Sequence, residues 1–101
     1  MSRTRVIRYE TRPEAADANR KLVEEVFAQL NADDPGALRY ATFQLADGVS
    51  FIHIAHYEDD SDPLSKVAAF AAFQNGIGER LVGPPIPAEA KLVGSYRFFA
   101  K

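Results

Sequence analysis

The chain contains no cysteine and no tryptophan, and it has only two histidines. Without cysteine it cannot form disulfides, thiolate zinc sites, iron–sulfur clusters or a cysteine nucleophile. No apolar run approaches the roughly 20 residues that a membrane-spanning helix needs. The N-terminal segment also lacks a signal-peptide core, because Val6 and Ile7 are followed at once by Arg8. These absences predict a cytoplasmic protein with no membrane partner.

The charge balance argues against nucleic acid as a partner. Twelve basic and 14 acidic side chains give a net charge of -2, which offers no electrostatic attraction for nucleic acid. The 101 residues contain no linker, repeat or low-complexity segment, and their length suits one hydrophobic core. We therefore predict a single domain that spans residues 1–101.

The spacing of apolar residues predicts an α+β fold. The expected elements, in chain order, are a strand at 4–10, a helix at 14–30, strands at 38–46 and 49–58, a helix at 63–81 and a strand at 91–99. The segment 82–90 contains three prolines and is expected to be an irregular connection. The order β-α-β-β-α-β is the ferredoxin-like arrangement, an antiparallel sheet with both helices on one face.

A hairpin sets the direction of both histidines. Asp47-Gly48 is a preferred pair for a two-residue type I′ turn, which places Thr42 opposite His53. Because side chains alternate along a strand, His53 and His56 point to opposite faces of the sheet. They cannot share a metal ion, and no other metal-ligand spacing occurs in the chain. No metal site is predicted.

The two faces of the hairpin differ in polarity. Ala41, Phe43, Ile52 and Ile54 make one nearly apolar face, which is expected to receive the helices. The opposite face is mixed and aromatic, and left open to water it would resemble an interface. Its members are Leu38, Tyr40, Thr42, Gln44, Phe51, His53 and Tyr57. We expect a second copy to cover this mixed face through a two-fold contact, which makes the protein a homodimer.

His53 is the candidate catalytic residue. It is central on the mixed face, and imidazole titrates near neutral pH, as an acid/base group requires. The simpler alternative is a neutral histidine hydrogen-bonded to Thr42 or across the dimer. Tyr40, Thr42 and Tyr57 are the candidate polar groups for a ligand.

Three phenylalanines are candidates for the wall of a binding pocket. Phe27, Phe70 and Phe73 lie at helical spacing and could line a cavity between helix and sheet. Such residues more often form ordinary core. The alanines around Phe70 and Phe73 either let the helix approach the sheet closely or leave room for a flat ligand.

Over almost its whole length the sequence resembles the dimeric α+β barrel superfamily, and within it the antibiotic biosynthesis monooxygenase-like (ABM) domains. The segments "GALRYATFQLADGVSFIHIAHYED", "LSKVAAFAAFQNGI" and "VGSYRFF" carry the resemblance, which is closest to small uncharacterised bacterial members. It implies that two subunits pair through their sheets into a barrel. In many such proteins the pocket lies between the sheet and the helices of one subunit.

The resemblance also implies a class of reaction. Relatives include quinone-forming oxygenases without a cofactor, haem-degrading monooxygenases, and small isomerases or decarboxylases. The haem-degrading branch carries a tryptophan and a histidine on its second helix, whereas this chain has no tryptophan and has "VAAF" at 67–70. No cofactor is therefore predicted. The leading hypothesis is a monooxygenase-like enzyme acting on a small aromatic or polyketide-like molecule, and the alternatives are a non-catalytic ligand-binding homodimer or a structural homodimer.

Overall fold

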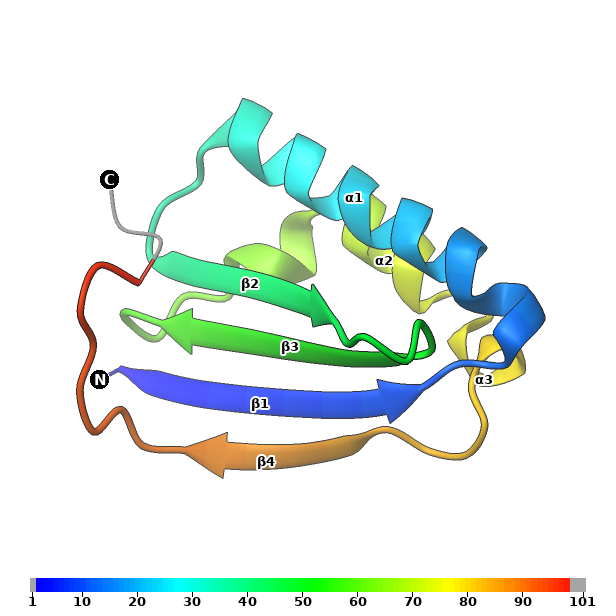
Figure 1. Cartoon of the computed structure of the whole chain (residues 1–101). Coiled ribbons are helices and arrows are strands. Elements are labelled where there is room, and N and C mark those ends of the chain that lie inside the picture. Colours follow the sequence, from blue (N-terminus) through cyan, green and yellow to red (C-terminus); the bar gives the residue numbers. More distant parts are fainter. Residues whose placement is uncertain (1, 99–101) are drawn as a thin grey trace.

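The computed structural model describes residues 2–98 and contains one sheet covered on one side by helices (Figure 1). The four strands lie in the order β2-β3-β1-β4, and every neighbouring pair is antiparallel. Their bounds are β1 Arg3–Glu10, β2 Leu38–Gln44, β3 Ser50–Tyr57 and β4 Ile86–Ala90. This is the predicted ferredoxin-like arrangement. No helix in the described part of the chain is long and apolar enough to cross a membrane.

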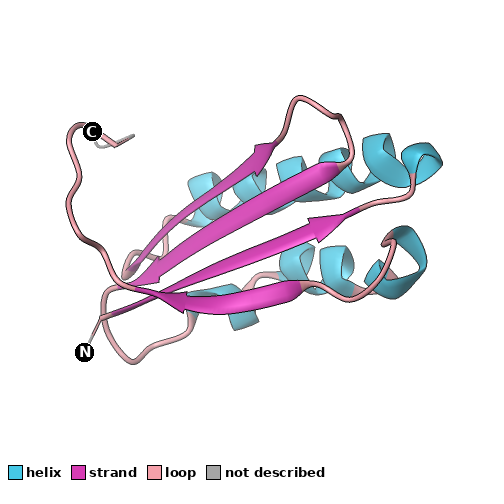
Figure 2. Cartoon of the chain, turned by 60° about the horizontal axis from the view of Figure 1, so that its bottom comes forward, coloured by secondary structure: helices cyan, strands magenta, loops and turns pink. Residues whose placement is uncertain are grey.

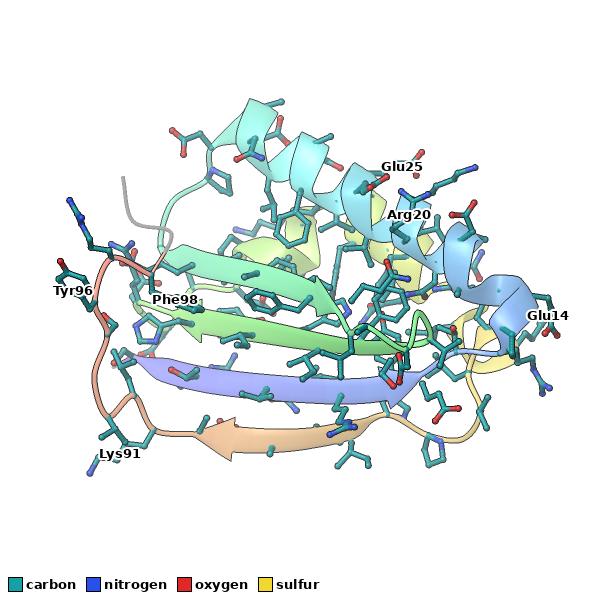
Figure 3. All side chains as sticks on the ribbon, in the orientation of Figure 1. Glu14, Arg20, Glu25, Lys91, Tyr96 and Phe98 are labelled. Atoms are coloured by element: carbon teal, nitrogen blue, oxygen red, sulfur yellow. The ribbon has the colours of Figure 1, made fainter. Side chains whose placement is uncertain are left out.

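The longest helix, α1 (Ala16–Asp33), begins after a 3-10 turn at Pro13–Ala15. Proline suits this first turn because its missing N–H would have no helical partner. The helix ends at Asp33, and the next residue, Asp34, has a left-handed φ of 46° and donates its N–H to the carbonyl of Leu30. Arg20 and Glu25 point away from the sheet in Figure 3, so the helix presents its charged side to water.

The second helical region is broken, where a continuous helix at 63–81 was predicted. It consists of a 3-10 turn at Pro63–Lys66, α2 (Ala68–Gln74) and the short α3 (Ile77–Arg80). Val67 has extended dihedral angles, and Gly76 has a φ of 74°, a conformation that interrupts a right-handed helix. Asp62 precedes Pro63, and its side chain makes no capping hydrogen bond.

The central hairpin keeps the predicted register and changes the predicted turn. Thr42 pairs with His53, and every other predicted pair from Leu38–Tyr57 to Gln44–Phe51 is present. The loop is longer than two residues, because the Leu45 N–H donates to Ser50 O and the Gly48 N–H donates to Leu45 O. The Asp47 carboxylate accepts hydrogen bonds from both Ser50 N and Ser50 Oγ, which stabilises this longer loop.

The last strand was predicted at 91–99, and this prediction is wrong. β4 lies at Ile86–Ala90, inside the proline-containing segment expected to be irregular, and 91–98 contain no strand. Residue 99 lies outside the described residues. Pro87 is tolerated opposite Ile7 because β4 is an edge strand, where only one side of the backbone pairs with a neighbour. Tyr96 and Phe98 lie on the segment that leaves the sheet (Figure 3).

The prediction of which face receives the helices is also wrong. Apart from Ser50 at its start, the buried residues of β3 are Phe51, His53, Ala55 and Tyr57, on the mixed face, and the apolar ones pack in one cluster with residues of α1 and α2. Figure 2 shows the helices behind the sheet and the other face uncovered. The aliphatic face with Ile52 and Ile54 is therefore the open one. Polarity was a poor guide because the polar groups of the mixed face bond to one another, and burying paired polar groups costs little.

Candidate functional site

A cavity of about 530 Å³ lies between the helix-covered face of the sheet and the α2 region. Strands β1 and β3 form its floor with Ile7, Tyr9, His53 and Tyr57, and Phe70 and Phe73 of α2 line its other side. The volume falls within the roughly 300–1,000 Å³ typical of small-molecule sites. The alanine-rich α2 thus leaves space against the sheet that its own side chains do not fill.

His53 is buried at one end of this cavity, with 5% of its surface exposed. Its Nε2 lies 2.7 Å from the Tyr9 hydroxyl. Its Nδ1 lies 2.7 Å from the Tyr40 hydroxyl and 3.0 Å from Thr42 Oγ1. Both ring nitrogens are therefore engaged by protein groups, and the predicted contact with Thr42 is present.

A second layer fixes the Tyr9 hydroxyl. Asn19 Nδ2 donates to Tyr9 Oη at 2.9 Å, and Arg80 Nε donates to Asn19 Oδ1 at 3.1 Å. Asn19 is fully buried, and the Arg80 guanidinium also lies 5.4 Å from the centre of the Phe73 ring. The chain of contacts joins four elements, β1, α1, β3 and α3, so the tertiary fold holds this end of the cavity rigidly.

These contacts determine where the protons lie. Arginine has only donors, so the Asn19 atom facing Arg80 is the carbonyl oxygen and the amide nitrogen faces Tyr9. Tyr9 Oη accepts that bond, which leaves its own hydrogen to donate to His53 Nε2. A neutral imidazole carries one proton, so the proton of His53 lies on Nδ1 and is donated to Tyr40 or Thr42.

His53 and the two tyrosines bonded to it, Tyr9 and Tyr40, form a network that is uncharged at neutral pH. Burial lowers the pKa of His53 to about 4 and raises the pKa of Tyr9 to about 12. Burial also raises the pKa of Tyr40. Desolvation disfavours the charged form of each group, and it is the cause that lowers the pKa of His53. This end of the cavity therefore offers polar but neutral hydrogen-bonding groups.

The structure brings the sequence-predicted site residues together. His53, Tyr40, Tyr57, Phe70 and Phe73 all line the cavity. The remaining two lie just behind it: Thr42 contacts the imidazole, and the ring of Phe27 stacks on Tyr40 with centroids 4.9 Å apart. Within residues 2–98 no three acidic, histidine or cysteine side chains gather as a metal site.

Sequence reasoning missed the roles of Asn19 and Arg80. Asn19 occupies a position in the apolar stripe of the first helix, and an amide at a core position indicates a buried partner. That signal was visible in the sequence, although the partner was not. Tyr9 is one of four tyrosines, and no sequence feature distinguishes it from the others. Tyr96, another of the four, is 84% exposed, so residue type alone does not indicate a place in the site.

Comparison with known proteins supports the fold. No protein-family model and no curated protein matches the chain. A solved structure provisionally named an antibiotic biosynthesis monooxygenase, from Nitrosomonas europaea, matches with a TM-score of 0.74 and 14% identity over 91% of this chain and 90% of that one. Another from Caulobacter crescentus matches with a TM-score of 0.71 and 20% identity over 92% and 91%.

The chain has the fold of these monooxygenase-named structures. A protein from Mycobacterium tuberculosis also shares it, with a TM-score of 0.70 and 20% identity over 94% of this chain and 98% of that one. The agreement over nearly the full length includes the sheet and its helical cover. At these identities the likeness establishes the ABM-like fold, so the chemistry has to be argued from the cavity and its residues.

Proposed function

We propose that the protein is a homodimeric monooxygenase-like enzyme that oxidises a small aromatic or polyketide-like phenol without a cofactor. The observation that carries the proposal is the cavity of about 530 Å³, walled by aromatic side chains and ending at the uncharged Tyr9–His53–Tyr40 network. A structural protein filled by its own side chains would lack such a space. The fold shared with monooxygenase-named structures supports the same class of reaction.

The reaction needs no external reductant. A phenol and O₂ give a quinone and water, so one oxygen atom enters the ring, the other leaves as water, and the substrate supplies all the electrons. The protein then has to bind the flat ring, exclude water, and stabilise the negative charge that develops on the phenol oxygen. Neutral hydrogen-bond donors held in a fixed position stabilise such charge without reorganising.

We assign that stabilisation to Tyr40 and a positioning role to His53. Direct proton removal by His53 is costly, because its pKa of about 4 lies far below the ordinary phenol value of about 10, a difference of roughly 8 kcal/mol. Donation from His53 Nδ1 to Tyr40 Oη leaves the Tyr40 hydrogen for its neighbour Thr42 or for a ligand oxygen. His53 thereby orients the phenol that meets the substrate.

Oxygen uptake and quinone absorbance test this function with a panel of phenols of one to three fused rings. We expect His53→Ala and Tyr40→Phe each to lower turnover by about a hundredfold or more, as loss of an oriented donor does. His56→Ala is the matched control, since His56 lies on the other face and bonds to Thr4. Unchanged turnover in His53→Ala would remove His53 from the mechanism.

A non-catalytic ligand-binding protein is the second candidate. It is favoured by one observation, namely that both nitrogens of His53 are already bonded to protein groups. This hypothesis predicts that a phenol binds saturably in the cavity, with no oxygen uptake and no product. The same panel therefore separates the two functions.

The proposed homodimer forms through the open face of the sheet. The register places Val6, Ile54 and Ala88 in one row across three strands, and Ile86 nearby is 66% exposed. A contiguous aliphatic face of this kind is suited to a self-complementary two-fold contact. The segment after β4 adds Val93, which is 96% exposed, as a further apolar contact for a second copy.

Analytical ultracentrifugation tests the dimer. We expect the wild type to sediment as a dimer and Ile54→Lys to sediment as a monomer, because a second copy would bury the lysine next to its own symmetry mate. Lys21→Gln, on the exposed side of α1, is the control and should stay dimeric. A monomeric wild type at micromolar concentration would contradict the proposal.

A further inference from the structure

The cavity has a second polar end, and this end is charged. Arg3 and Arg5 line it together with Tyr57 and Asp62. On β1 the odd-numbered residues face the helices, so the arginines follow in one row from Ile7 and Tyr9. The cavity therefore runs from a neutral hydrogen-bonding end at His53 to a cationic end at the start of β1.

Arg5 carries an unused hydrogen-bond donor. Its Nε is buried and has no hydrogen-bond partner among the described residues. The Glu89 carboxylate lies 3.9 Å from this atom, beyond hydrogen-bond distance, and its side chain is 70% exposed. A buried N–H without a partner is costly. The Arg5 side chain as a whole is 40% exposed and lines the cavity, so its guanidinium group can meet a ligand there.

The charges that line this end favour an anion. Among the residues that line this end, two guanidinium groups oppose one carboxylate, that of Asp62; the Glu89 carboxylate that pairs with Arg5 lies outside the lining and is exposed to water. Arg3 lies over the ring of Tyr57, with its guanidinium carbon 4.5 Å from the ring centre. The aromatic ring thus holds one arginine at the cavity, and Arg5 lines the cavity beside it.

We propose that the ligand is an aromatic carboxylic acid that also bears a phenol, with its carboxylate on Arg5 and its hydroxyl at the Tyr40–His53 end. The arginine side chain presents parallel N–H groups that match the two oxygens of a carboxylate. The inference rests on the proposed function, because it places the ligand in the same cavity.

The strand register sets the size of this ligand. In the pairing of β1 with β3, Arg5 lies opposite Ala55 and Ile7 lies opposite His53. Tyr40 also lies opposite Ala55, so Arg5 and Tyr40 occupy one row across the sheet, two strand spacings or roughly 10 Å apart, and His53 lies two residues further along β3. Phe70 and Phe73 lie along the same cavity and would contact the ring system between the ends.

Isothermal titration with 6-hydroxy-2-naphthoate and with its uncharged carboxamide tests the inference. We expect the wild type to bind the acid at least tenfold more tightly than the amide, since hydrogen bonds to charged groups are the stronger ones. Arg5→Gln should reduce this ratio to about 1, mainly by weakening the binding of the acid. Asp62→Asn should tighten acid binding, and Lys21→Gln, which removes a distant positive charge, should change neither.

The outcomes separate this inference from the function on which it rests. Equal binding of acid and amide to the wild type, with shifts in the NMR signals of the His53 ring, would overturn the acid specificity and leave the cavity as the binding site. If neither probe binds, or if binding leaves the His53 signals unmoved, both the inference and the proposed site are overturned. The comparison of the two probes on the wild type does not depend on how well any variant folds.

Discussion

Burial of His53 should make the stability of the protein depend on pH. Its pKa is about 4 in the folded state and about 6.5 in the unfolded chain, so the unfolded state binds the proton first as pH falls. The stability that comes from keeping His53 neutral is present above pH 6.5 and is lost between pH 6.5 and 4. A shift of 2.5 pKa units corresponds to about 3 kcal/mol, of which about 2 kcal/mol is lost by pH 5.

Urea denaturation at fixed protein concentration between pH 7 and pH 4.5 measures this loss. Asp17, Asp47 and Asp59 have pKa values lowered below the ordinary carboxylate range, so their contributions are lost at still lower pH and fall outside the window. His53→Gln should be less stable at pH 7 and should lack most of the slope. His56→Gln keeps His53 and should retain its contribution.

Two results would refute the reasoning. If wild type and His53→Gln lose stability in parallel from pH 7 to pH 5, His53 is not held neutral by burial. If NMR shows the His53 ring titrating near 6.5, the same conclusion follows, and the base role that we reject for this residue becomes feasible.

Three further predictions concern the supports of the site and the hairpin. Nitrogen NMR of the imidazole should show the proton of His53 on Nδ1, and a proton on Nε2 would contradict the donor chain from Arg80 through Asn19 and Tyr9. Asn19→Leu should lower the free energy of unfolding by about 2 kcal/mol, because it removes a buried donor from Tyr9; a thermal melt that matches the wild type would contradict this. Gly48→Ala should cost about 1 kcal/mol through backbone strain alone, since φ is 80° and no atom lies within 4 Å of the added carbon; a loss of several kcal/mol would indicate a different turn.

The polar network also explains why a buried histidine is compatible with a stable core. His53, Tyr9, Tyr40 and Asn19 together occupy the helix-covered side of the sheet, yet each finds partners there. Removing one member leaves the others with unpaired groups, so single substitutions in the network are costly and the intact network holds its geometry. Such rigidity is what a site needs when its hydroxyl groups must meet a ligand in one orientation.

The sequence by itself determined the order of elements, the register of the hairpin and the opposite directions of His53 and His56, because strand periodicity and turn chemistry act over a few residues. It also placed Tyr40, Thr42 and Tyr57 in one set with His53. Local pattern could not decide which face of the sheet meets the helices, since that depends on whether distant polar groups find partners.

Tertiary structure alone decided the remaining features. Asn19 and Arg80 are 61 residues apart, and the chain of hydrogen bonds from Arg80 through Asn19 to Tyr9 exists only because α1, α3 and β1 converge. The last strand formed at Ile86–Ala90 because an edge position accepts Pro87, although the segment 91–99 had the better strand composition. The free N–H of Arg5 likewise follows from packing, because burial and the distance to Glu89 are set by neighbouring strands.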